Sequence, residues 1–364
     1  MTDSALLQQT LEDSLTWNRA RLKLLARVIL ALLQVRSVNL ARLAAALPGK
    51  TEFASRYKQL QRLMRRFELP FDELTRLLVK LAGVKAPFIL VLDRTEWKIR
   101  GKSVNVLVLC LWRNGVCCPI VWHVLAKAGC TSHLERVALL EEFKRVIGFD
   151  KVKYVIGDRE FHGKKFYQYL QREKLRFRLR VRHDTAFTSS SGRVLRGREL
   201  VRGLAIGVTV KFRRSKLLWG AKVRVWAKRL SETETLIVVA PAGEKKSQIF
   251  DEYGERWRIE EMFESVKTRG FYLEGTRLCE PERLRRLIAI IALSFIWAVR
   301  VGEIMAKDKP IRINKEGRRT RSIFRVGLDE LTQIITHLAE SWWQAKFANV
   351  VRLMSDKTNT RLRL

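Results

Sequence analysis

The order of apolar runs between residues 86 and 182 restricts the fold of this chain more than any other feature of its sequence. Each run is six to ten residues long and rich in Val, Ile, Leu or Phe, which is typical of strands. Patterns with helical spacing separate the later runs. The order is therefore three strands, a helix, a strand, a helix and a fifth strand, which predicts a mixed α/β fold. The five runs are residues 86–93, 103–112, 116–125, 153–158 and 176–181.

Two local signals support the connections within this region. Asn114-Gly115 separates the second and third runs, and an Asn-Gly pair is typical of a hairpin turn because both residues tolerate a positive φ. Ser132 and Glu135 have the spacing of a capping box, which begins a helix. A meander of three strands followed by helix, strand, helix and strand is the order of a ribonuclease H-like α/β core, and we predict that fold.

The first and fourth runs both end in an aspartate, Asp93 and Asp158. Their strands are neighbours in such a core, so the two carboxylates should lie close together and repel each other unless a cation lies between them. Carboxylate oxygens suit Mg²⁺, or Mn²⁺ in its place. A third carboxylate, for which Glu260 is our candidate, would complete a catalytic site for two ions about 3.5–4 Å apart that promotes phosphoryl transfer. The alternative for any single aspartate at a strand end is a turn or cap residue.

Glu260 belongs to a segment in which four polar residues share one side of a predicted helix. Tyr253, Arg256, Glu260 and Lys267 stand at positions i, i+3, i+7 and i+14, which fall within about 60° of one another at 100° per residue. Apolar residues occupy the neighbouring flank. We therefore predict one helix through residues 253–267, with one flank packed and the other facing a phosphate backbone and a metal.

The chain is strongly basic, with 71 Lys and Arg against 37 Asp and Glu and a formal net charge of +34. Such an excess indicates a polyanionic partner, and nucleic acid is favoured because each neutralised phosphate releases a counterion. An anionic membrane surface is the alternative, although the basic residues are dispersed rather than gathered in one amphipathic helix. A hydrophobic content of 47% indicates a folded protein rather than a basic tail.

Helical spacing dominates both ends of the chain. Residues 38–47 have the pattern of the first helix of a helix-turn-helix, and a basic helix follows, so this region is either a DNA-end recognition domain or an ordinary basic helical bundle. Towards the C-terminus we predict a helix over 281–304, an exposed basic loop over 310–325 and one amphipathic helix from 328 to about 353.

Cysteine usage and the N-terminal residues predict a cytoplasmic protein. The five cysteines are odd in number and include no C-x-x-C pair, so we expect buried reduced thiols rather than disulfides or a zinc site. The chain does not begin with a basic stretch followed by an apolar run, so no signal peptide is predicted. Residues 287–299 are apolar but too few to span a bilayer, which predicts a buried helix and no membrane partner.

Three blocks of this sequence resemble DDE transposases of bacterial insertion sequences. They are residues 91–97 around Asp93, residues 155–161 around Asp158, and Tyr253-x2-Arg256-x3-Glu260-x6-Lys267, which resembles the Y-R-E-K signature of the insertion-sequence-four family. The resemblance covers residues 15–305 or so. It implies a ribonuclease H-like fold in which Asp93, Asp158 and Glu260 hold two Mg²⁺.

The resemblance also implies an activity and its partners. A transposase of this family binds double-stranded DNA at the terminal inverted repeats, nicks it and joins the 3′ ends to target DNA. A DNA hairpin forms on the way, and the synaptic complex is a homodimer. For this chain that implies a bacterial protein of the cytoplasm that acts on the nucleoid. Two other functions stay open: a ribonuclease H-like nuclease without strand transfer, and a basic DNA-binding protein without catalysis.

Further residues take roles from the same resemblance. Tyr253, Arg256 and Lys267 match signature positions assigned to DNA phosphate contacts near a flipped base. The family has a β-rich insertion before the glutamate helix, and short alternating runs at 207–212, 221–226 and 235–239 agree with it. Within it, Trp219 or Trp226 could stack on the flipped base, with a core role as the alternative for each. Arg159 could bind phosphate, with a surface salt bridge as its alternative.

These inferences divide the chain into five predicted regions. An N-terminal helical DNA-binding domain comes first, then a ribonuclease H-like core interrupted by a β-rich insertion, and finally a C-terminal helical region. The regions are 1–82 (DNA-binding), 86–182 (core, first part), 183–246 (insertion), 247–306 (core, second part, with the glutamate helix) and 307–364 (C-terminal helices).

Overall fold

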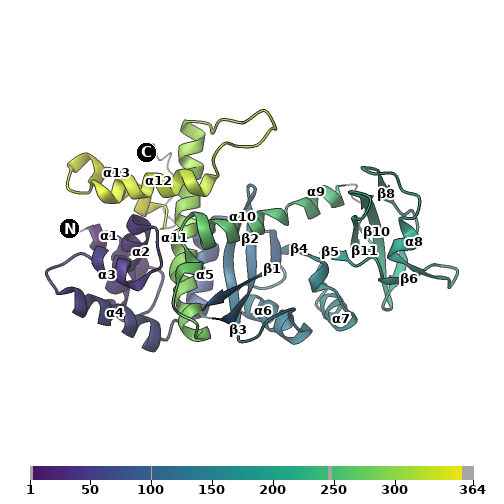
Figure 1. Ribbon diagram of the computed structural model, residues 1–364, viewed down its shortest axis with the longest axis horizontal. Helices are drawn as coiled ribbons and strands as arrows, with labels where there is room; N and C mark the ends of the chain where they lie inside the picture. Colours follow the sequence, from purple (N-terminus) through teal and green to yellow (C-terminus); the bar gives the residue numbers. More distant parts are fainter. Residues whose placement is uncertain (1–2, 100, 245–247, 355–364) are drawn as a thin grey trace.

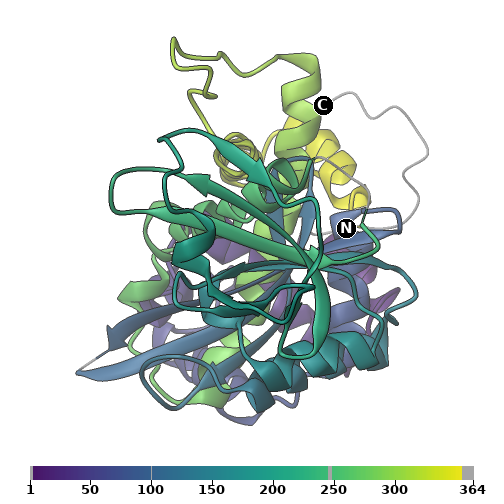
Figure 2. The ribbon, with the colours of Figure 1, turned by 90° about the vertical axis from the view of Figure 1, so that its right-hand side faces the viewer.

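The computed structural model describes residues 3–99, 101–244 and 248–354. Residues 1–2 of the predicted N-terminal domain, 245–246 of the predicted insertion and 355–364 of the predicted C-terminal region lie outside the described residues. The molecule is elongated, with a helical body at one end, a mixed sheet in the middle and a β-rich lobe at the other end (Figure 1). Figure 2 shows the lobe end-on, with the rest of the molecule behind it.

The predicted strand order is confirmed in the middle of the molecule. Five strands lie in the spatial order β3-β2-β1-β4-β5, with the first three antiparallel and β4 parallel to both β1 and β5. This arrangement is consistent with a ribonuclease H-like core. The strands are β1 Phe88–Ile99, β2 Lys102–Arg113, β3 Val116–Leu125, β4 Val152–Gly157 and β5 Phe177–Val181.

The predicted turn and helix start are also confirmed. Asn114 and Gly115 have φ values of 46° and 79°, and they connect β2 to β3 as a hairpin. The side chain of Ser132 accepts a hydrogen bond from the N–H of Glu135, and the Glu135 carboxylate accepts one from the N–H of Ser132. This capping box begins helix α6, His133–Val146, and α7 follows β4 as Lys164–Arg172.

The prediction that the first strand ends at Asp93 was wrong. β1 continues to Ile99 because β2 pairs with it along its whole length, from Leu90 opposite Leu111 to Ile99 opposite Lys102. Only the parallel pairing with β4 stops before Asp93. The apolar run marks only the part of β1 whose side chains are mostly buried, up to Leu92, whereas the strand continues to Ile99 with less buried residues.

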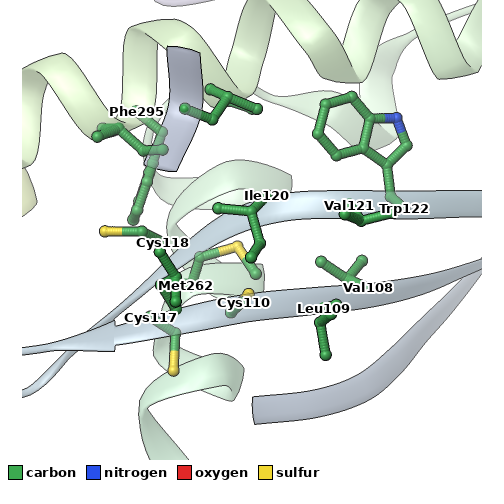
Figure 3. Close-up of a cluster of buried hydrophobic side chains, with 14 of the residues drawn as sticks. Val108, Leu109, Cys110, Cys117, Cys118, Ile120, Val121, Trp122, Met262 and Phe295 are labelled. Atoms are coloured by element: carbon green, nitrogen blue, oxygen red, sulfur yellow. The ribbon is translucent and has the colours of Figure 1, made fainter. Parts of the chain in front are cut away.

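A buried cluster joins β2 and β3 to the helices that cover one face of the sheet. Cys110, Cys117 and Cys118 lie in this cluster with Met262 of helix α10, Trp257–Glu264, and with Phe295 of helix α11, Pro281–Asp308 (Figure 3). Burial raises the pKa of the Cys118 thiol to about 12. These three thiols confirm the predicted buried cysteines. Cys130 contradicts that prediction because it is exposed, and Cys279 is half-buried; all five are free.

The insertion is β-rich, as predicted, but it does not form a separate sheet. β11 pairs antiparallel with β5, with Ile237 opposite Val181 and Val239 opposite Leu179. The core and the lobe therefore share one sheet of eleven strands. The elements of the lobe are β6 Ala186–Thr188, β7 Val194–Arg196, α8 Gly197–Leu200, β8 Thr209–Lys211, β9 Lys216–Leu218, β10 Ala221–Arg229 and β11 Thr235–Pro241.

Helices from the two ends of the chain pack together as one body. α2 contacts α11 and α12, and α1 contacts α13, so the N-terminal and C-terminal helices share a core. The remaining helices of this body are α1 Asp3–Glu12, α2 Arg19–Val35, α3 Leu40–Ala46, α4 Phe53–Arg66, α5 Phe71–Ala82, α12 Ile323–Thr336 and α13 Ser341–Arg352.

The single helix predicted over 328–353 was wrong, because α12 and α13 are separate helices. On one continuous helix, Phe347 would lie about 120° around the axis from Ile335, at 100° per residue. Both side chains are buried, and the turn between the two helices lets each pack with its own orientation. The loop predicted over 310–325 is exposed from 312 to 322, and α12 begins at Ile323.

Among the described residues, α11 is the one helix long and apolar enough to cross a membrane by length and composition. A second candidate arises only if α2 and α3 are taken together across their 104° bend. Within the most apolar window of α11, 83% is buried inside the protein, where the helix packs against α2, α5, α12 and β3. The buried helix predicted at 287–299 is confirmed.

α11 and α12 touch through their backbones at two glycines. A Cβ atom on Gly327 would overlap the carbonyl oxygen of Ala298, and one on Gly302 would overlap the carbonyl oxygen of Ile323. The atoms in conflict are backbone atoms, which cannot rotate away as a side chain can. The contact between these two helices therefore requires glycine at both positions.

We expect Gly327→Ala to lower the free energy of unfolding by about 2 kcal/mol or more, because α12 must move away from α11. The matched control is Gly254→Ala, since a Cβ there meets no atom within 4 Å and the residue ends a helix. The control should be neutral or stabilising by up to about 1 kcal/mol. Urea unfolding of both variants checks this; equal stabilities would contradict the backbone contact.

Candidate functional site

The sheet register places Asp93 and Asp158 side by side, as the sequence predicted. Leu92 lies opposite Gly157 in the last parallel pair of β1 and β4, and each aspartate is the next residue along the chain, Asp93 still within β1 and Asp158 just after β4. The exposed fractions of the two side chains are 14% for Asp93 and 24% for Asp158. Two carboxylates thus share a partly enclosed position at the end of the β1–β4 ladder.

Asp93 is the more enclosed of the two carboxylates. Burial raises the pKa of Asp93 to about 7, and the negative charges of Asp158 and Glu260 act in the same direction. The Arg256 guanidinium and the N–H of Arg94, which donates to Oδ1 of Asp93 at 2.8 Å, oppose the rise. An ionised Asp93 therefore depends on nearby positive charge.

The single helix predicted over 253–267 was wrong. The segment consists of α9, Ile249–Gly254, then α10, Trp257–Glu264, and then a π-helical turn, Ser265–Arg269. Glu255 and Arg256 form the break between α9 and α10. Gly254 favours a break at this point because glycine loses more backbone entropy in a helix than other residues do.

Tyr253 and Arg256 nevertheless reach the aspartates from this broken helix. The Arg256 guanidinium lies between two carboxylates, with Nη1 3.0 Å from Oδ2 of Asp93 and Nη2 2.7 Å from Oε1 of Glu260. The Tyr253 hydroxyl donates to Oδ1 of Asp158 at 3.1 Å. Burial, and then the charge of Asp158, raise the pKa of Tyr253, so the hydroxyl stays protonated and remains a donor.

The structure thus brings together five of the residues that the sequence singled out. They are Asp93, Asp158, Tyr253, Arg256 and Glu260. The sequence predicted that Tyr253 and Arg256 face DNA phosphate; in the structure both bind carboxylates, and each is only 5% exposed. The carboxylates of the site thus receive hydrogen bonds from Tyr253 and an ion pair from Arg256, both groups of the protein itself.

Lys267 lies apart from this cluster. Its Nζ is 2.8 Å from Oε1 of Glu274 and 3.5 Å from the carbonyl oxygen of Glu96, and it lies over the ring of Trp97. The π-helical turn explains the difference, because it winds fewer degrees per residue than the α-helix assumed in the prediction. Lys267 therefore lies beside the part of β1 that continues beyond Asp93.

The carboxylate set suits a divalent metal in its chemistry. Asp93, Asp158 and Glu260 offer only oxygen ligands, which Mg²⁺ and Mn²⁺ prefer. In the described part of the chain, no group of three His, Cys, Asp or Glu side chains is arranged to hold a metal ion. The Arg256 guanidinium lies between Asp93 and Glu260, where it supplies the positive charge. A metal shared by these two carboxylates would require Arg256 to give up at least one of its contacts.

Glu160 belongs to a polar network beside the two aspartates that the sequence did not predict. Its Oε2 accepts from Nε of Arg94 at 2.5 Å, and its Oε1 accepts from both the N–H and the hydroxyl of Thr131 at 2.9 Å. Arg136, which is 6% exposed, donates to the Thr131 hydroxyl and to the carbonyl of His162. Arg94 directly follows Asp93, and Glu160 lies two residues after Asp158. Their contact connects the chain after Asp93 to the chain after Asp158.

The two candidate tryptophans have different surroundings. Trp219 is half-buried, and its ring lies 6.2 Å from that of His162 and 5.0 Å from that of Tyr167, so it connects the lobe to the loop after Asp158. Trp226 is 1% exposed inside the lobe, which leaves no face of its ring open to a base. Arg159 is exposed.

A comparison with known proteins finds one matching family. The sequence model described as "Transposase DDE domain" matches residues 87–297. The match begins one residue before β1 and ends within α11, so it includes Asp93, Asp158, Glu260 and the whole β-rich lobe. No curated protein matches the chain.

The contacts of Arg256 predict its contribution to stability. Arg256→Met should lower the free energy of unfolding by roughly 3 kcal/mol, because it leaves the enclosed Asp93 carboxylate without its counter-charge. The double variant Arg256→Met with Asp93→Asn should regain part of this loss, since the uncompensated charge is then gone. Urea unfolding at neutral pH measures both; a double variant no more stable than the single one would contradict this dependence.

Proposed function

We propose, from the premise that this chain belongs to the transposase DDE domain family, that it cuts double-stranded DNA at the ends of a mobile element and joins them to a target. The observation that supports this proposal is that Asp93 and Asp158 follow the last paired residues of β1 and β4, while Arg256 joins Asp93 to Glu260. We assign the family's three acidic residues to these positions. We also place the chain in the insertion-sequence-four group, on the spacing of Tyr253, Arg256, Glu260 and Lys267.

The three carboxylates would hold two Mg²⁺, with Mn²⁺ as a substitute. When bound, such ions activate water or a 3′ hydroxyl as nucleophile and stabilise the leaving oxygen of the phosphodiester. The protein's own part is to orient the carboxylates. Tyr253 does this for Asp158, and Arg256 does it for Asp93 and Glu260 until the ions take its place.

Residues around the carboxylates would position the DNA. Arg256, once released from a carboxylate, is a bidentate donor suited to phosphate. Lys267, beside the extension of β1, and the exposed Arg159, next to Asp158, are further candidates for phosphate contacts. Trp219 is the candidate for stacking on a flipped base, since Trp226 is enclosed. The exposed basic side of α4, with Lys58, Arg62, Arg65 and Arg66, is the candidate for recognition of the element's ends.

The remaining steps follow the family. Strand transfer of the freed 3′ ends, a DNA hairpin on the way and a homodimeric synaptic complex are the course that we propose for this chain. Each rests on membership of the family together with the Y-R-E-K spacing, and each is open to a direct DNA assay.

Glu260→Gln should leave DNA binding within a few-fold of the parent and lower Mg²⁺-dependent cleavage by roughly a thousandfold or more. The amide keeps the shape of the side chain and removes the charge that a metal requires. Glu261→Gln is the matched control, because Glu261 is exposed on the same helix and pairs only with Arg258 among the described residues. Cleavage of a plasmid that carries the element's ends measures both; equal rates would remove Glu260 from the proposed site.

A strand-transfer assay tests joining separately from cutting. A labelled duplex with a pre-cleaved 3′ end should become attached to plasmid DNA in the presence of Mg²⁺, because a transposase uses that hydroxyl as its nucleophile. A nuclease without transfer would cut the plasmid and leave the label unattached. A protein that binds both DNAs and alters neither would be a non-catalytic binding protein.

A further inference from the structure

The segment between α11 and α12, residues 309–322, forms a hairpin that stands away from the rest of the molecule (Figures 1 and 2). We call it the basic arm. The N–H of Thr320 donates to the carbonyl of Arg312 at 2.9 Å, and the N–H of Asn314 donates to the carbonyl of Arg318 at 2.8 Å. The arm therefore has a defined backbone path, although every residue from 312 to 322 is exposed.

The basic arm concentrates positive charge that the protein does not neutralise. It contains six Lys or Arg residues and one acidic residue, Glu316, for a formal charge of 6 − 1 = +5. Arg321 pairs with Asp329 of α12. For the other five cations, the described residues supply no ion pair. These five are Lys309, Arg312, Lys315, Arg318 and Arg319.

The base of the arm is rigid. The arm leaves α11 a few residues after Gly302 and enters α12 just before Gly327, and these two glycines are where the helices touch backbone to backbone. A hairpin held between two such closely packed helices keeps its direction. A flexible basic tail, in contrast, has no fixed direction and can neutralise any nearby anion.

The same base contacts the π-helical turn that follows α10 and the residues just after it. Nη1 of Arg325 donates to the carbonyl of Arg269 at 3.4 Å, and the ring of Phe324 packs edge-on against that of Phe271 at 5.6 Å. Arg269 ends the π-helical turn that carries Lys267. The arm therefore enters α12 beside the turn that carries Lys267.

We propose that the basic arm binds the sugar-phosphate backbone of duplex DNA outside the candidate active site, without reading its sequence. Five exposed cations without an ion pair among the described residues can each neutralise a phosphate, and contacts to phosphates position a protein on DNA. This inference rests on the proposed function, because it assumes that DNA occupies the site. It adds a second point of attachment that fixes the direction in which the duplex leaves.

The test compares the salt dependence of DNA binding. The variant Lys315→Ala/Arg318→Ala/Arg319→Ala should make the slope of log K against log salt shallower by about 2–3, at roughly 0.9 per lost phosphate contact. The control variant, Lys151→Ala/Arg172→Ala/Lys174→Ala, removes three exposed basic residues beyond the opposite end of β4 and should change the slope by less than about 1. Arg318→Lys/Arg319→Lys keeps the charge and should keep the parental slope.

The measurement uses two duplexes, one that ends in the element's own terminal repeat and one of unrelated sequence. If the arm variant has the shallower slope only on the first, the arm binds end DNA; if only on the second, it binds target DNA. The proposal is overturned if the parent binds and cleaves DNA while the arm variant keeps the parental slope on both duplexes. It is also overturned if the arm variant loses only its binding to phosphatidylglycerol vesicles. A shallower slope in a protein that never cleaves DNA would support the arm and contradict the proposed enzyme.

Discussion

The candidate site depends on one ionic interaction, in which the buried Arg256 guanidinium lies between the enclosed carboxylate of Asp93 and the more exposed carboxylate of Glu260. Burial makes an ionised Asp93 unfavourable, and the neighbouring Asp158 adds to that effect. A fixed positive charge is needed wherever such carboxylates are gathered, and here the protein supplies it. Arg256 stands at the break between α9 and α10. The position of this break therefore decides where the guanidinium that pairs with Asp93 and Glu260 lies.

The surroundings of the site divide into a rigid part and a part that can rearrange. The sheet, the Glu160 network and the backbone contact between α11 and α12 hold the ends of β1 and β4 and the base of the helical body. Arg256 and Tyr253, by contrast, are attached to the carboxylates only by hydrogen bonds and ion pairs that a metal or a phosphate can replace. Binding of a substrate at this site would therefore change side-chain partners before it changed the fold.

The strand order and the adjacency of Asp93 and Asp158 were predictable from sequence because each follows from local patterns. Apolar runs mark the strands, and parallel pairing brings the ends of β1 and β4 together. The extension of β1 to Ile99, the ion pair between Arg256 and Asp93, and the Glu160 network were not predictable in this way. Each depends on a distant partner, namely β2 for the extension, Asp93 for Arg256 and Arg94 for Glu160.

The pairing of β5 with β11 has a consequence for how the molecule can move. Because backbone pairing continues from β3 through β5 to β11, the lobe is attached to the core by strand pairing as well as by its two chain connections. A swing of the lobe, which carries Trp219, away from the carboxylates of the core would break the hydrogen bonds between β5 and β11.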